Sequence, residues 1–275
     1  MKKHFAILAA LLTASSAFAQ LAAPVRAQIY LTASPEDPRT GEIRWVATAK
    51  EYVFGFRATP SATTMSEIRY KPAQIAQLKV ETPPAYAQIR TQLQSTNPDA
   101  AITALNKIVT DYRMLQWDTL AARDLAVLHN NAKRWDETIK LGSGFERDNP
   151  DAVSTSTFAP LYWTALQQAG KDTAKIPKWI DTAVAAAPRA VAAAALNVRG
   201  DMLRTDNQTK KDALVDGYLR VALLYGTEKE ANAEALFKAA QVFNELGQTA
   251  YAEKMREQLI SAHPGSSWTK KMQGK

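Results

Sequence analysis

Cysteine is absent from this chain of 275 residues, and histidine is scarce, with three residues. Without cysteine, the chain has no disulfides, no thiolate metal sites and no lipid-modified cysteine after a leader. It also has no run of about 18 uninterrupted apolar residues, the length a membrane-spanning helix requires. We therefore expect a soluble mature protein that is held together by packing alone.

Motifs for catalysis are missing as well. The two histidines beyond the N-terminal region, His129 and His263, lie at expected helix ends, where a surface or capping role is the usual one. The chain has no H-E-x-x-H, G-x-S-x-G, Walker-type or dinucleotide-binding glycine pattern. Gly142-Ser143-Gly144 falls inside an expected helix, which indicates a kink or a close helix contact. We expect a protein that is not an enzyme and has no cofactor, metal or catalytic residue.

The N-terminus has the three parts of a secretory signal peptide. Lys2 and Lys3 are followed by an apolar run, 5–12, and then by small residues that end in Ala17-Phe18-Ala19. This pattern predicts cleavage after Ala19 and a periplasmic or secreted protein. Because an exported eukaryotic protein of this size would more often have disulfides, a bacterial envelope is the expected location.

The net charge is mildly positive. It is +7 for the whole chain, and removal of Lys2 and Lys3 leaves 7 − 2 = +5. A balance of this size without a Lys/Arg block is a weak indication of an anionic partner. Export makes nucleic acid the least expected partner.

Residues 20–82 have the composition of a small β domain. β-Branched and aromatic residues are dense, and apolar positions alternate with polar ones, as in Ile43 and Trp45. Turns are expected at Thr40-Gly41 and 48–50, and a loop at 34–38, whose prolines cannot join a ladder. The predicted strands are 27–33, 42–47, 51–57, 65–70 and 78–81.

The end of this region is typical of a particular kind of small barrel. The segment 71–80 predicts one short helical turn that leads into a last strand. Several short strands closed by such a turn and strand resemble SH3-like or Sm-like barrels.

After Pro83-Pro84, which cannot continue a strand, the apolar period becomes helical. Five helical hairpins are predicted, and their second helices end near Tyr112, Pro150, Pro188, Gly226 and Pro264, 38 residues apart each time. A constant interval of this size indicates one supersecondary unit stacked on itself. The expected helix pairs are 85–94 with 98–112, 117–131 with 134–148, 157–169 with 176–187, 189–204 with 210–225, and 229–246 with 249–262.

The last unit resembles a tetratricopeptide repeat. Leu236, Ala240, Gly247, Ala252 and Pro264 stand where that family has its large, small and helix-ending residues. Earlier units match less fully, since the second has Thr138 at a small position. The resemblance implies a mainly α fold, an α-solenoid of about five TPR-like hairpins over 83–275, preceded by the small all-β domain.

Such a stack presents a concave surface that is built mainly from the first helix of each pair. The family's ligand-facing positions, carried onto this sequence, imply partner contacts by Arg123, Asn130, Gln168, Asn197, Asp201, Arg204, Gln241 and Asn244. Amide and guanidinium groups suit the recognition of extended peptides or carboxylates, although the same residues are also typical of a solvated surface.

Two functions are consistent with this organisation. In the first, the chain is a scaffold or adaptor that binds a protein or peptide partner of the cell envelope through the repeat surface. In the second, it binds carbohydrate or cell-wall glycan by stacking of Trp45, Tyr52 or Tyr70 of the β domain on sugar rings.

Overall fold

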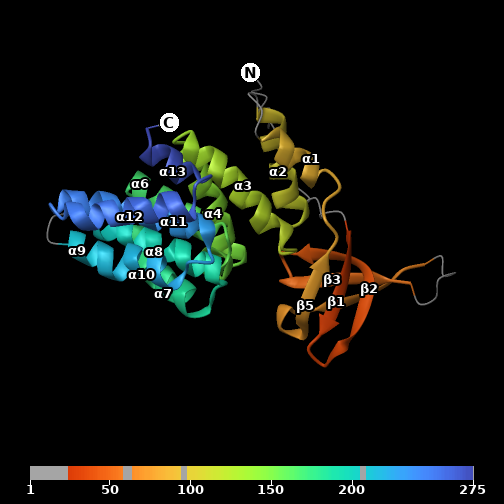
Figure 1. Ribbon diagram of the computed structural model, residues 1–275. Helices are drawn as coiled ribbons and strands as arrows, with labels where there is room; N and C mark the ends of the chain where they lie inside the picture. Colours follow the sequence, from red (N-terminus) through yellow and green to blue (C-terminus); the bar gives the residue numbers. More distant parts are fainter. Residues whose placement is uncertain (1–23, 58–63, 94–97, 205–208, 275) are drawn as a thin grey trace, which may run out of the picture.

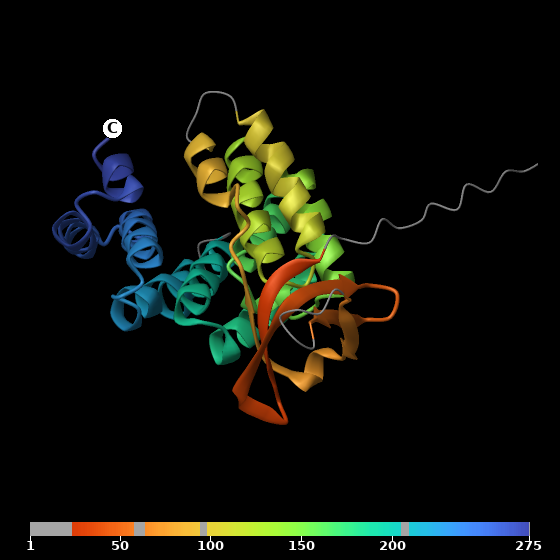
Figure 2. The ribbon, with the colours of Figure 1, turned by 90° about the vertical axis from the view of Figure 1, so that its right-hand side faces the viewer.

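The computed structural model describes residues 24–57, 64–93, 98–204 and 209–274. An antiparallel sheet lies within 25–80, and helices follow it (Figure 1). Figures 1 and 2 both show the sheet and the C-terminal helices at separate ends of the molecule. The expected signal peptide lies outside the described residues.

The sheet has five strands in the order β4-β3-β2-β1-β5, and each described pairing is antiparallel. As predicted, one short helical turn, η1 (Pro72–Gln74), leads into the last strand. β4 and β5 are the two edge strands of the sheet. The strands are β1 (Val25–Leu31), β2 (Ser34–Val46), β3 (Glu51–Phe56), β4 (Ser66–Tyr70) and β5 (Ile75–Val80).

Two expectations for the first hairpin are wrong. The segment 34–38 belongs to β2, and its prolines fall in the irregular stretch of register between the pairs Leu31↔Ser34 and Ile29↔Arg39, where no ladder bond is required of them. Thr40-Gly41 is also strand and not turn. A Cβ on Gly41 would lie 2.2 Å from the Gly55 carbonyl oxygen, so this glycine serves a close approach of two strands.

The helical part consists of stacked hairpins, as predicted, with no strand in the described residues between 100 and 262. Second helices end at Asp111, Asp148, Ala186, Leu224 and Ala262, at intervals of 37, 38, 38 and 38 residues. The hairpins pair α1 (Tyr86–Gln92) with α2 (Asp99–Asp111), α3 (Trp117–Asn131) with α4 (Trp135–Asp148), α6 (Ala159–Ala169) with α7 (Ile176–Ala186), α8 (Arg189–Leu203) with the segment that ends in α10 (Leu219–Leu224), and α11 (Lys229–Glu245) with α12 (Thr249–Ala262).

Several short elements supplement the hairpins. The sequence did not predict α5 (Ala152–Thr155) or the terminal α13 (Ser267–Met272). A 3₁₀ turn, η2 (Thr173–Lys175), precedes α7. The second helix of the fourth hairpin begins as α9 (Lys210–Asp212) and continues through a π-helical segment, η3 (Ala213–Tyr218).

Glycines allow close helix contacts at two places. Gly142 lies within an unbroken α4, and a Cβ there would lie 2.3 Å from the Tyr162 ring, which favours the close-contact interpretation of this motif. Where α8 meets η3, a Cβ on Gly217 would lie 2.6 Å from the Cα of Gly200. Both crossings therefore leave no room for even a methyl group at the glycine.

Aromatic side chains of the sheet form its core. Trp45, Tyr52 and Tyr70 are all buried, together with Ile29, Ile43 and Phe54. The Trp45 and Tyr52 rings pack edge to face with centroids 4.8 Å apart. The hypothesis that these three rings stack on sugars is therefore wrong, because their faces are covered by the protein's own side chains.

Leu115, in the loop between α2 and α3, completes this core although it belongs to the helical part. Its side chain is 0% exposed and packs in the cluster of the sheet. The Tyr52 hydroxyl donates a hydrogen bond to the Met114 carbonyl oxygen at 2.9 Å. Asp118 accepts the Met114 amide at 2.8 Å and holds the loop in place. The core of the sheet thus includes residues of the helical part.

Replacing Leu115 by Ala is expected to lower the free energy of unfolding by about 3 kcal/mol, because it removes buried methyl groups and leaves a cavity. Chemical denaturation monitored by circular dichroism measures this change. Leu224→Ala is the matched control, since Leu224 is 60% exposed and should be replaceable without effect. Equal stability of the two variants would show that Leu115 does not join the two parts.

Candidate functional site

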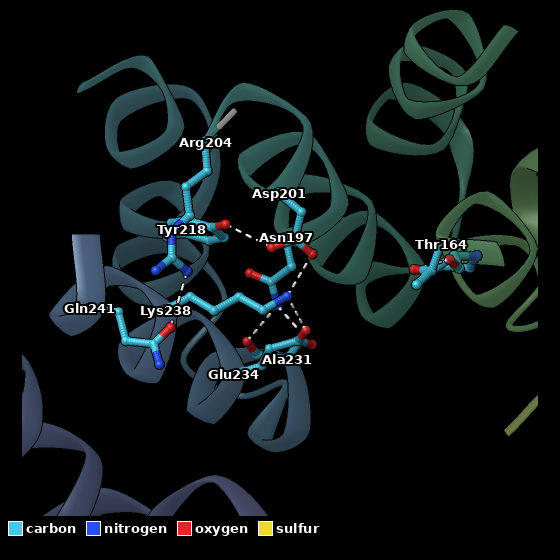
Figure 3. A network of polar contacts seen from close by, with 10 residues as sticks. Thr164, Asn197, Asp201, Arg204, Tyr218, Ala231, Glu234, Lys238 and Gln241 are labelled. Atoms are coloured by element: carbon cyan, nitrogen blue, oxygen red, sulfur yellow. Dashed lines mark hydrogen bonds and ion pairs between the residues drawn. The ribbon is translucent and has the colours of Figure 1, made fainter. Parts of the chain in front are cut away.

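The first helices of successive hairpins pack on one another: α3 contacts α6, α6 contacts α8, and α8 contacts α11. Polar side chains bridge the α3–α6 and α8–α11 junctions, and the larger group joins α8 to α11 (Figure 3). We call this group the α8–α11 network. Its members are Asn197, Asp201, Arg204, Tyr218, Glu234, Lys238 and Gln241.

Lys238 is the centre of the network. Its ammonium lies 2.6 Å from both Asp201 and Glu234, and its side chain is only 14% exposed. Burial works against the charged ammonium, but Glu234 and Asp201 outweigh burial and raise the pKa of Lys238. The lysine therefore remains a buried cation that holds two carboxylates from neighbouring hairpins.

Tyr218 and Arg204 extend the network on either side of Asp201. The Tyr218 hydroxyl donates to Asp201 at 2.7 Å, and burial, together with Asp201, raises the pKa of this tyrosine. The Arg204 guanidinium donates to Gln241 at 3.0 Å and forms an ion pair with Glu245. Each charged group thus has a partner one hairpin away.

Asn197 is a fully buried polar member, with 1% exposure. Its amide donates to the Ala231 carbonyl at 2.9 Å and to Glu234 at 3.3 Å, while its Oδ1 has no partner among the described residues. Thr164 of α6 lies to one side of the group in Figure 3 and donates to the Pro160 carbonyl within its own helix.

The same kind of junction occurs at α3. Arg123 pairs with Asp124 at 2.6 Å, and Asp124 accepts the Tyr86 hydroxyl of α1 at 2.7 Å. Asn130 donates to the Leu161 carbonyl of α6 at 2.9 Å and accepts from Thr138. These polar groups connect one hairpin to the next.

The structure therefore brings together four of the eight predicted site residues and separates the others. Asn197, Asp201, Arg204 and Gln241 share the α8–α11 network, while Arg123 and Asn130 lie at the α3 junctions. Arg123 and Arg204, carried over as ligand-facing positions, are less exposed than that role implies, because both are half-buried and form ion pairs within the chain. Gln168 and Asn244 are the exposed members of the set.

Three members of the network were not predicted: Tyr218, Glu234 and Lys238. A signal for two of them was present in the sequence, since Asp201 and Lys238 lie 37 residues apart, as do Asn197 and Glu234. That spacing is one hairpin interval, so complementary polar residues separated by it were candidates for contact between repeats.

His129 differs from the expected surface residue. It is 6% exposed, and its Nδ1 has no hydrogen-bond partner among the described residues. Burial, with a contribution from Arg134, lowers its pKa. His263 lies near a helix end as expected, with Nε2 2.9 Å from the Asn232 amide oxygen, and burial lowers its pKa too.

Neither a candidate metal site nor a candidate membrane span occurs in the part of the chain that the structure describes. That part holds no group of three or more His, Cys, Asp or Glu side chains that could hold a metal ion. None of its helices is long and apolar enough to cross a membrane.

Residues 234–266, which include most of α11 and all of α12, match the family model of the tetratricopeptide repeat. The match confirms the family resemblance for the last hairpin, and such repeats suggest a protein-interaction scaffold. No curated protein and no solved structure matches the chain.

Replacing Lys238 by Met is expected to lower the free energy of unfolding by about 2 to 4 kcal/mol, because two partly buried carboxylates lose their shared cation. Lys254→Met, on an exposed position of α12, is the control and should leave stability unchanged. Denaturant titration of both variants measures the difference. A parent-like midpoint for Lys238→Met would show that the ion pairs only offset their own desolvation.

Stability should also fall as the pH is lowered from about 7 to about 5. The folded pKa of His129 is below its unfolded value of about 6.5, so in this window the unfolded chain binds a proton that the folded chain does not. His129→Gln should therefore flatten the slope of unfolding free energy against pH. Identical slopes in the variant and the parent would contradict the buried, neutral imidazole.

Proposed function

We propose that this protein is an exported, non-enzymatic scaffold or adaptor that binds a protein or peptide partner of the cell envelope through the face of its first helices. The observation that carries the proposal is the gathering of half-buried polar groups from α8 and α11 on a stacked-hairpin frame whose last unit matches the tetratricopeptide repeat. Export rests on the sequence pattern of residues 1–19.

The chemistry of this face suits an extended, polar segment. Asp201, Arg204 and Glu234 keep side-chain exposures of 28%, 27% and 25%, so each presents part of its charged group to solvent. Because these groups are held by neighbouring hairpins, they lose little side-chain entropy when a partner binds. Exposed amides at Gln168 and Asn244 add donors and acceptors for a peptide backbone.

Cell-wall glycan is the alternative partner. The rings first considered for sugar stacking are buried, so a glycan would have to bind elsewhere on the chain. The polar first-helix face is the better-supported surface, and a protein partner is the one we propose.

The test is capture of envelope proteins by the immobilised mature chain, followed by their identification. Replacing Arg123 and Arg204 together by Ala should weaken retention of a specific partner about tenfold or more, since the part of each guanidinium that stays exposed, at 29% and 27%, can still form charge-assisted hydrogen bonds. Lys178→Ala with Lys254→Ala is the control, because it removes the same charge from exposed positions of α7 and α12.

Thermal unfolding of both double variants shows whether the fold is retained, which matters because Arg204 has partners within the chain. A third variant, Arg26→Ala with Lys79→Ala, changes the exposed side of β1 and β5. If this variant loses the partner while the folded Arg123/Arg204 variant keeps it, the sheet is the binding surface and the proposal is wrong.

A further inference from the structure

A groove between α2 and α4 lies apart from the α8–α11 network and has a different lining. Its volume is about 560 Å³, within the usual range of small-molecule sites. Apolar side chains of Ile102, Val109 and Leu141 line part of it, and His129 of α3 contributes to its wall.

Cations outnumber anions in this lining. The cations are Arg113, Arg134, Lys140 and Arg147, and the carboxylates are Glu137 and Asp148, so the excess is 4 − 2 = +2 with His129 neutral. Arg113 and Arg147 both bind Asp148, at 2.7 and 2.8 Å. The single negative charge of Asp148 is therefore shared between two guanidinium groups.

Arg134 and Lys140 are the cations of the groove that are free to bind a ligand. Both are exposed, and neither forms an ion pair with the residues that the structure describes. They lie at the start and in the middle of α4, on the side that faces α2 across the groove. With Glu137 between them, Arg134 and Lys140 leave one net positive charge beside apolar side chains, which fits a ligand with an anionic end and an apolar body.

His129 lies at the wall of the groove with its imidazole buried. A buried polar nitrogen without a hydrogen bond is rare and costs free energy, so such a group requires an explanation. No described residue forms a hydrogen bond with Nδ1 of His129, although the residue lines a groove.

We propose that the α2–α4 groove binds a small organic oxyanion, with its carboxylate or phosphate end held by Arg134 and Lys140 beside His129, and its apolar body against Ile102, Val109 and Leu141. Guanidinium and ammonium groups bind both kinds of oxyanion, and the apolar side chains select for a carbon body attached to it. The site goes beyond the proposed scaffold function and does not use its surface.

The histidines provide a site-specific readout, because His129 and His263 are the only two in the mature chain. Proton NMR of the imidazole signals is recorded while hexanoate, inorganic phosphate or neutral hexanamide is added at constant pH. We expect hexanoate to shift the His129 signal in a saturable way and to leave the His263 signal in place. Phosphate is an oxyanion without an apolar chain, and hexanamide has the apolar chain without a charge, so the two compounds test the two parts of the site separately.

Arg134→Gln with Lys140→Gln should weaken hexanoate binding about tenfold or more, as expected for the loss of charge-assisted hydrogen bonds. Lys178→Gln with Lys254→Gln is the matched control for net charge and should bind like the parent. Both pairs are exposed, so the folds should be retained, and an unchanged His263 signal checks this.

Three results would overturn the proposal. The first is that neither anion shifts the His129 signal in a saturable way at millimolar concentration. The second is that hexanoate and hexanamide shift it equally, and the third is that the Arg134/Lys140 variant binds hexanoate as well as the parent does. A shift with phosphate that hexanoate does not produce would overturn the apolar part of the site. Loss of envelope partners plays no part in this test, so its failure is separate from failure of the scaffold function.

Discussion

The helical part depends on the burial of apolar faces that no hairpin can cover alone. Each hairpin places one face against its neighbour, and the contacts between successive first helices continue from α3 to α11. Alanine and glycine at the crossings let the backbones approach, as the contact of Gly200 with Gly217 shows. The constant spacing follows from this packing, because a longer or shorter unit would move its apolar face out of register with the next.

Polar groups are placed within this apolar frame where hairpins meet. Lys238 pairs with Asp201 one unit away and with Glu234 in its own helix. Asp124 likewise accepts from Tyr86 one unit away and pairs with its neighbour Arg123. Buried ion pairs of this kind add little net stability, but an unpaired member would be costly. They therefore favour one register of stacking over its alternatives, and they leave partly exposed charges on the surface that a partner would contact.

Local pattern was sufficient to predict the helices, and tertiary contact accounts for most of what it did not predict. The helical period and the turn residues placed the five hairpins, with second-helix ends within two residues of the structure. The same approach wrongly predicted a loop at 34–38 and a turn at Gly41, because proline and glycine often form loops and turns. In the structure the prolines lie in a strand of irregular register, and Gly41 allows two strands to approach closely. Burial of Leu115 and His129 depends on which helices come together, and local periodicity does not contain that information. For the site, half of the predicted residues converge, and the partner Lys238 could be found only by comparing positions one interval apart.

The shared core around Leu115 has a consequence for how this chain could be recombined. Pro83-Pro84 looks like the natural seam between two modules, and a splice there would keep each run of strands or helices whole. It would nevertheless leave the leucine on one fragment and its socket, lined by Ile29, Ile43 and Phe54, on the other. A graft of the sheet onto a foreign helical stack would need a loop of the same shape, with the left-handed backbone at Met114 and Gln116 on either side of the leucine. A fragment that is transferred with its core intact must therefore extend from the first strand into α3.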